Sequence, residues 1–138
     1  MGKSILVIDD TKKILILIKI SLEKEGYEVM TASDPLEGIK LAQENPVDLV
    51  ILDVMMPKMD GYEVAEALHR DPRTNRIPIL LLTARAVLQA TKRQFLYTVY
   101  GYMAKPFHRE MLLAKVEEIL SVVNHPSEAG PGPAGEQK

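Results

Sequence analysis

The sequence contains no cysteine among its 138 residues. Disulfide bonds, thiolate metal sites and cysteine nucleophiles are therefore excluded. A strong excess of one charge is also missing, because 17 basic residues face 19 acidic ones and the formal net charge is -2. No basic field is present that would attract a nucleic acid or a membrane surface. We therefore expect a protein that binds neither of them directly.

Long apolar runs are absent as well. The first run, residues 5–8, ends at two aspartates and is far too short for a signal peptide or a membrane-spanning helix. Apolar residues make up 46% and charged residues 26%, as in ordinary globular domains. These features predict one cytoplasmic domain over residues 1–123. Residues 124–138 are rich in glycine and proline without apolar periodicity, so we expect a disordered C-terminal tail there.

Within the domain, short apolar runs alternate with longer amphipathic segments. This alternation is typical of parallel strands joined by crossover helices, and predicts an α/β (βα)5 three-layer sandwich. The expected strands are 4–8, 27–31, 47–52, 77–82 and 99–104. The expected helices are 12–25, 34–45, 60–70, 86–97 and 107–123. Local chemistry supports several boundaries, for example the N-cap and proline pair Asp34-Pro35, the Asp60-Gly61 pair that opens the third helix, and the helix-ending Gly26.

Chemically reactive side chains stand where these strands end. Asp9 and Asp10 follow the first strand, Asp53 the third, Thr83 the fourth and Lys105 the fifth. In an open parallel sheet, residues just past the carboxyl ends of neighbouring strands converge on one crevice. Each residue alone would be an ordinary loop, cap or surface residue. Together they predict a site for a divalent cation and a phosphoryl group.

Crowded carboxylates raise one another's pKa values, and a hard cation relieves that repulsion. Mg2+ prefers oxygen ligands, usually one or two carboxylates with waters and a phosphate oxygen. We expect Asp10 and Asp53 to bind it directly and Asp9 to act through water. Asp53 is the candidate nucleophile towards phosphorus. Lys105 and the Thr83 hydroxyl are placed to contact phosphoryl oxygens.

Four segments carry a family resemblance: residues 8–10 (IDD), 52–63 (LDVMMPKMDGYE), 82–85 (LTAR) and 105–107 (KPF). Over about residues 3–123 the chain resembles the receiver domain of two-component response regulators, the CheY-like family. The resemblance implies a flavodoxin-like sheet of order 2-1-3-4-5 and transfer of phosphate to Asp53 from a histidine kinase or histidine phosphotransfer protein. It also implies Mg2+ binding with the Met55 main-chain carbonyl as a further ligand, and a cis bond before Pro106 that aims Lys105. Such a protein is a phosphoacceptor in a relay, not an enzyme with a separate substrate.

The same resemblance implies a switch. Phosphorylation draws Thr83 inward, and Tyr102 is the matching aromatic residue that fills the vacated space on the surface of the fourth helix, fifth strand and fifth helix. Family members commonly carry acids where this chain has Tyr100 and Gly101. Their absence argues against the salt-bridged dimer of DNA-binding relatives, so we expect a monomer or weak dimer with an unidentified downstream protein target. Met55 and Arg85 predict slow loss of the phosphoryl group.

The first predicted helix carries apolar residues on more than one side. Ile14, Leu17, Ile18 and Leu22 fit a buried stripe at helical spacing. Leu15, Ile16 and Ile20 then fall towards another side. That side is either a broader core stripe or a docking surface for a kinase helix.

Three other functions share parts of this sequence pattern. A phosphatase of the haloacid dehalogenase type needs two acids separated by one residue after the first strand, whereas Asp9 and Asp10 are adjacent. A flavodoxin-like cofactor binder needs a phosphate-cradling loop there, and two aspartates would repel that phosphate. The third is a receiver fragment of a longer DNA-binding or enzymatic regulator. We expect instead a free-standing receiver that acts through protein contacts.

Overall fold

The computed structural model describes residues 2–83 and 99–124. Five parallel strands form one sheet in the order β2-β1-β3-β4-β5. They are β1 Ser4–Ile8, β2 Glu28–Ala32, β3 Leu49–Asp53, β4 Ile79–Thr83 and β5 Val99–Ala104. The described helices are α1 Lys12–Glu23, α2 Pro35–Glu44, α3 Gly61–Arg70 and α5 Arg109–Asn124. The predicted α/β sandwich and its 2-1-3-4-5 strand order are confirmed.

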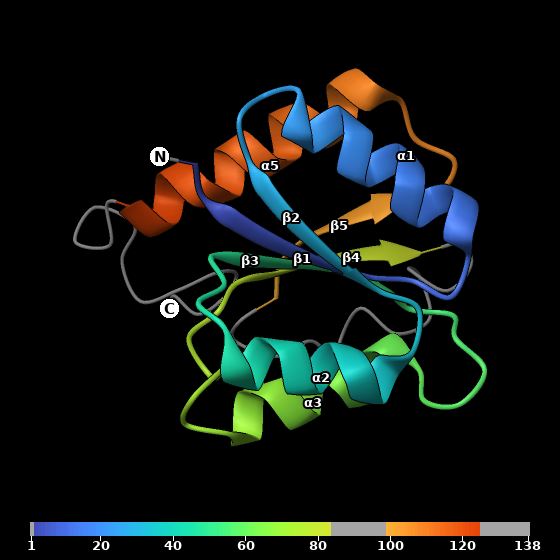
Figure 1. The fold of residues 1–138 in the computed structure, drawn as a ribbon, viewed down its shortest axis with the longest axis vertical. Coiled ribbons are helices and arrows are strands. Elements are labelled where there is room, and N and C mark those ends of the chain that lie inside the picture. The colour runs from blue at the N-terminus through green and yellow to red at the C-terminus, as the bar shows by residue number, and fades with distance from the viewer. Residues whose placement is uncertain (1, 84–98, 125–138) are drawn as a thin grey trace.

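Helices cover both faces of the sheet, with α1 and α5 on one side and α2 and α3 on the other (Figure 1). One buried cluster joins the sheet to α1 and α5, and a second joins it to α2 and α3. All residues of β3 and β4 are buried, as expected for strands covered on both faces. No helix within residues 2–83 and 99–124 combines the length and apolarity needed to cross a membrane. The expected helix at 86–97 and residues 125–138 of the expected tail lie outside the described residues. Asn124, expected to begin the tail, is instead the last residue of α5.

Helix starts agree with the predicted capping chemistry. Asp34 accepts hydrogen bonds from the backbone N–H groups of Leu36 and Glu37, and Pro35 is the first helical residue of α2. Asp60 and Glu63 form a reciprocal capping box at the start of α3. α2 and α3 each begin one residue later than expected because the capping residue itself has an extended backbone, whereas α1 begins where expected and α5 begins two residues later. Gly26 has a φ of 93°, the left-handed conformation expected after α1.

Three strands differ from their predicted bounds. β2, β3 and β4 end one residue later than the apolar runs that predicted them, at Ala32, Asp53 and Thr83. Asp53 and Thr83 are therefore the last residues of their strands rather than the first residues beyond them. Their backbones stay in the sheet because Asp53 pairs with Leu82 and Thr83 with Ala104. The backbone pairing of the sheet thus fixes the positions from which two of the reactive side chains extend.

The buried stripe of α1 was predicted partly wrongly. Leu15, Ile18 and Leu22 are buried, whereas Leu17 is 48% exposed. Spacings of three and four residues keep positions 15, 18 and 22 on one side of a helix. Leu17 lies about 100° around the helix from Ile18, which turns it towards solvent together with the exposed Ile16 and Ile20. The apolar sequence of α1 left both assignments open, and packing against the sheet selected one.

Candidate functional site

The strand order brings the predicted reactive residues to one edge of the sheet. β1 lies between β2 and β3, so Asp9 and Asp10 emerge beside Asp53. Thr83 follows on β4, and Lys105 comes directly after β5. All five strands point their carboxyl ends towards the right of Figure 1. Residues that are as many as 96 positions apart in sequence are thereby joined, as the contact between Asp9 and Lys105 shows.

Three carboxylates form the centre of this site. One oxygen from each of Asp9, Asp10 and Asp53 lies within 4.8 Å of the others. Asp9 and Asp53 are buried, whereas Asp10 is exposed at the mouth. Asp9 also accepts a hydrogen bond from the backbone N–H of Thr11 at 2.9 Å, which orients its carboxylate. The site therefore has two fixed, shielded acids and one that faces solvent.

Lys105 supplies the positive charge. Its Nζ lies 3.2 Å from Asp9 Oδ2 and 3.1 Å from Asp53 Oδ1. The Lys105-Pro106 peptide bond is cis, as predicted, and the Lys105 backbone N–H donates to the Thr83 carbonyl at 2.9 Å. Burial lowers the pKa of Lys105, but the carboxylates of Asp9 and Asp53 outweigh it and raise that pKa overall. The ammonium group is therefore charged at neutral pH and is shared between two acids.

The Asp53 carboxyl has an unusual pKa. Its removal from water raises the pKa to about 6, and repulsion from Asp9 acts in the same direction. The Lys105 ammonium and the Met55 backbone N–H, 3.3 Å from Asp53 Oδ1, oppose the rise without cancelling it. One ammonium group is thus too little positive charge for these buried acids. A divalent cation held by carboxylate oxygens fits this donor set, and Asp9, Asp10 and Asp53 are the residues that would hold it.

Two further predicted residues line the β4 and β5 side. Thr83 is completely buried at the end of β4. Tyr102, on β5, packs against the cluster beneath α3, and its hydroxyl is buried without a hydrogen-bond partner among the described residues. That burial raises the pKa of Tyr102 to about 12, with a smaller effect from Tyr62. The predicted fourth helix and Arg85 lie outside the described residues, so the switch surface stays a prediction.

An ion pair beside the site was missed by sequence reasoning. Lys58, in the loop between β3 and α3, places its Nζ 3.0 Å from Oδ1 of Asp34. Asp34 was identified only as the N-cap of α2. The two residues are 24 positions apart, and nothing in either local segment indicates the other. Lys58 and Asp34 come into contact only because the order of the strands places α2 and α3 on the same face of the sheet.

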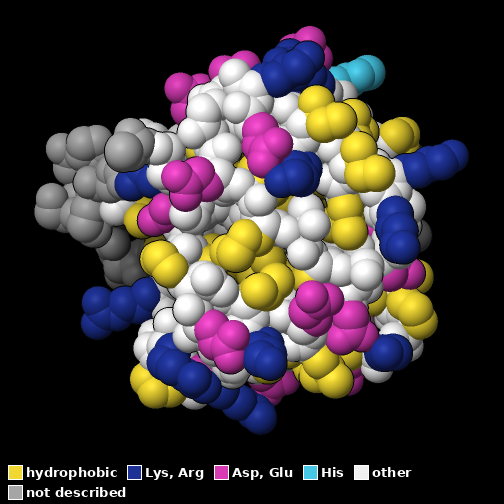
Figure 2. All heavy atoms as spheres, in the orientation of Figure 1, with side chains coloured by type: hydrophobic (Ala, Val, Ile, Leu, Met, Phe, Trp, Pro, Cys, Tyr) yellow, Lys and Arg dark blue, Asp and Glu magenta, His cyan; other side chains and the backbone are white. Residues whose placement is uncertain are grey.

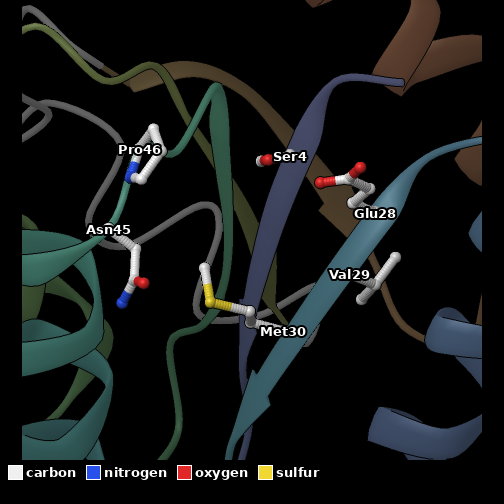
Figure 3. A pocket seen from close by; sticks show the side chains of 6 residues that line it. All are labelled: Ser4, Glu28, Val29, Met30, Asn45 and Pro46. Atoms are coloured by element: carbon white, nitrogen blue, oxygen red, sulfur yellow. The ribbon is translucent and has the colours of Figure 1, made fainter. Parts of the chain in front are cut away.

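Two surface hollows lie at opposite ends of the strands. The first, of about 280 Å³, lies between α1 and the end of β2, with Lys12, Ile16, Ser33 and Glu37 among its lining residues. Ile16 is exposed on α1, as are Leu17 and Ile20, and Figure 2 shows hydrophobic side chains gathered over α1. The second, of about 200 Å³, is lined by residues from the starts of β1 and β2 and from the end of α2 (Figure 3). It contains none of the five reactive residues.

Known proteins resemble this chain both in sequence and in structure. A family model described as "Response regulator receiver domain" matches residues 5–117. The DNA-binding dual master transcriptional regulator RpaA of Synechocystis sp. is 43% identical over 116 residues, which make up 84% of this chain and 48% of RpaA. The chain spans about half the length of the curated relatives it matches.

Solved structures show the same likeness. A CheY-like response regulator receiver domain protein from Methanospirillum hungatei JF-1 has a TM-score of 0.83 at 29% identity, covering 91% of this chain and 99% of that one. The receiver domain of the sensor histidine kinase PA1611 from Pseudomonas aeruginosa PAO1 was solved with a magnesium ion coordinated in its active-site cleft. Its TM-score is 0.73 at 30% identity, over 88% of this chain and 96% of that one.

Proposed function

This chain belongs to the response regulator receiver domain family, and we propose that it accepts a phosphoryl group on Asp53 in a two-component relay. The donor is a histidine kinase or a histidine phosphotransfer protein. The observation that carries the proposal is the convergence of three carboxylates with Lys105 at the carboxyl ends of β1, β3 and β5. Thr83 completes the set from β4. The receiver in this proposal extends from residue 1 to the end of α5 at Asn124, and the residues after it form a tail.

The proposed chemistry is a direct displacement at phosphorus. A carboxylate oxygen of Asp53 forms a bond to phosphorus while the phosphorus–nitrogen bond of the donor phosphohistidine breaks, and the electron pair stays on the imidazole. Lys105 moves from Asp53 to a phosphoryl oxygen and keeps its contact with Asp9, and the Thr83 hydroxyl donates to a second phosphoryl oxygen. When bound, Mg2+ would supply positive charge that offsets the negative charge of the carboxylates and of the incoming phosphoryl group. Asp10, Asp53 and the Met55 main-chain carbonyl would bind it directly, and Asp9 would act through water.

A donor protein has a suitable surface beside this site. Ile16, Leu17 and Ile20 are each about half exposed on α1, and the 280 Å³ hollow opens next to them. An amphipathic helix of the donor would cover these apolar side chains while its histidine reaches the crevice. The same proposal assigns the output to the surface that includes β5 and α5, where Tyr102 and Thr83 respond to phosphorylation.

The decisive experiment is phosphorylation by acetyl phosphate with and without Mg2+, followed by intact mass measurement. The parent protein is expected to gain one phosphoryl group only when Mg2+ is present. Asp53→Asn is expected to gain none. Glu44→Gln, which neutralises an exposed acid at the far end of α2, is the matched control and should react like the parent. A phosphoryl group on the Asp53→Asn protein would place the acceptor elsewhere and reject the proposal.

The relatives favour a second candidate for the whole protein. RpaA is named as a DNA-binding transcriptional regulator, and this chain matches about half of it. As the receiver part of such a regulator, the domain would control DNA binding by an attached module, and the phosphoacceptor chemistry would be unchanged. A free-standing receiver acts through protein contacts alone. The mass of the native protein in its source cells, measured with an antibody to this domain, separates the two candidates.

A further inference from the structure

The loop between β3 and α3 carries the residues that shape one wall of the site. It is held firmly at both ends, because the Val54 N–H donates to the Leu82 carbonyl and the Gly61 N–H donates to the Val54 carbonyl. Met56, in the middle of the loop, is buried in the cluster beneath α2 and α3. Met55, whose carbonyl is a proposed cation ligand, lies between these anchors with an exposed side chain.

The outer part of this loop is joined to the neighbouring loop by a charged pair. Lys58 Nζ lies 3.0 Å from Asp34 Oδ1. The other oxygen of Asp34, Oδ2, accepts from the backbone N–H groups of Leu36 and Glu37 at the start of α2. Asp34 is therefore a fixed anchor, since its carboxylate is already oriented by the helix end. The hydrogen bond from Lys58 is also the main reason that the pKa of Asp34 lies below its ordinary value.

The position of the pair in the fold relates it to the metal site. Asp34 follows β2 and Lys58 follows β3, and β1 lies between those two strands. The pair therefore spans the end of the strand that carries Asp9 and Asp10. A bridge across this point restrains the β3–α3 loop relative to the acids with which Met55 would share a cation.

We propose that the Lys58–Asp34 ion pair is a positioning device that holds the β3–α3 loop in the conformation that binds the divalent cation. This inference rests on the proposed function, because it deepens the role of the same site. Lys58 does not touch the cation or the phosphoryl group. It acts by limiting the movement of the loop, so that less ordering is required when the cation binds.

The sign of the effect separates this role from simple electrostatics. A lysine near an acid cluster repels a cation, so a lysine that acts only through its charge should weaken Mg2+ binding. Its removal would then leave the Mg2+ affinity unchanged or raise it. A lysine that positions the loop has the opposite effect, and its removal should lower the affinity. The Lys58 side chain is 71% exposed and that of Asp34 33%, so the expected change is modest, about two- to fivefold.

The test is titration of the metal-free protein with MgCl2 by isothermal calorimetry. Lys58→Gln and Asp34→Asn are compared singly and together, because asparagine still caps the helix while losing the charge. Each single variant is expected to bind Mg2+ about two- to fivefold more weakly than the parent. In the double variant, the fold loss of affinity is expected to be smaller than the product of the two single losses, because both variants break the same ion pair. Lys58→Arg should restore most of the affinity. Lys24→Gln is the control and should bind Mg2+ like the parent, because Lys24 caps the C-terminal end of α1, whereas Asp9 and Asp10 precede its N-terminal end.

Unfolding by urea without metal supplies the second measurement. The unfolding midpoint of Lys58→Gln is expected to match that of the parent, because the pair is exposed. Unchanged or tighter Mg2+ binding by Lys58→Gln would overturn the inference. Weaker Mg2+ binding together with a lower urea unfolding midpoint would also overturn it, because the lysine would then act on the stability of the whole fold. A parent protein that binds no Mg2+ would instead reject the proposed function, so the two failures are distinguishable.

Discussion

Replacement of Asp53 by asparagine should make the metal-free protein more stable at neutral pH. The Asp53 carboxylate is 2% exposed and lies beside Asp9, and the folded protein must keep it charged there above pH 6. Asparagine has nearly the same shape and no charge. The substitution also removes the ion pair with Lys105. The favourable effect of that pair is already contained in the pKa of Asp53, which is raised in spite of it. A proposed functional residue is therefore expected to lower the stability of the fold.

The pKa supplies both the size and the sign of the effect. Folding raises the pKa of Asp53 from 3.8 to about 6, and each unit corresponds to about 1.4 kcal/mol. The ionised carboxylate thus lowers the free energy of unfolding by at most about 3 kcal/mol at pH 7.5. Between about pH 4 and pH 6 the folded protein binds more protons at Asp53 than the unfolded chain does. From this group alone, stability rises as the pH falls through 6 and decreases again as the pH increases.

Urea unfolding followed by circular dichroism at pH 7.5 and pH 5, with a chelator present, measures this effect. Asp53→Asn is expected to be the more stable protein at pH 7.5, with a smaller advantage at pH 5. Addition of Mg2+ should reverse the order, because a ligand that binds only the folded state stabilises it by about 1.4 kcal/mol per tenfold excess over its dissociation constant. An Asp53→Asn protein that is less stable than the parent at pH 7.5 without metal would refute this reasoning, and Glu44→Gln again serves as the control.

Three other predictions concern packing and docking. A Cβ at Gly61 would lie 2.5 Å from the Asp53 carbonyl oxygen, so Gly61→Ala should lower the free energy of unfolding by about 1–3 kcal/mol; an unchanged urea midpoint would contradict this. Leu22→Ala should cost about 2–5 kcal/mol, while Leu17→Ala should stay within about 0.5 kcal/mol, and equal losses would disprove the assignment of the buried stripe. Ile16→Lys should slow phosphotransfer from the donor protein about tenfold or more without changing the rate with acetyl phosphate, and equal slowing in both assays would count against docking on α1.

Comparison of prediction and structure shows where local information was sufficient. Asp34-Pro35 and Asp60-Gly61 marked two helix starts because a capping carboxylate acts on N–H groups two or three residues away. β3 and β4 were recognisable because a strand covered on both faces favours a continuous apolar run, which here is interrupted only at the last residue of each strand. The reactive side chains that converge at the sheet edge could also be recognised, since each follows or ends an apolar run.

Other features depend on neighbours that are remote in sequence. The apolar residues of α1 offered more than one possible stripe, and contact with the sheet selected Leu15 over Leu17. Lys105 was expected to contact a phosphoryl group, and in the structure its ammonium group lies between the carboxylates of Asp9 and Asp53. The low dielectric around Asp53, which raises its pKa, is likewise a product of packing.

The amino-acid order alone therefore determined the fold class, the helix caps and the set of reactive side chains at the strand ends, because periodicity, capping and side-chain type act over a few residues. Distances between those groups, their ionisation and the pairing of Lys58 with Asp34 were decided only when β1 came to lie between β2 and β3. The physical reason is that electrostatic energy depends on separation in space and on the exclusion of water. Neither quantity can be obtained from separation along the chain.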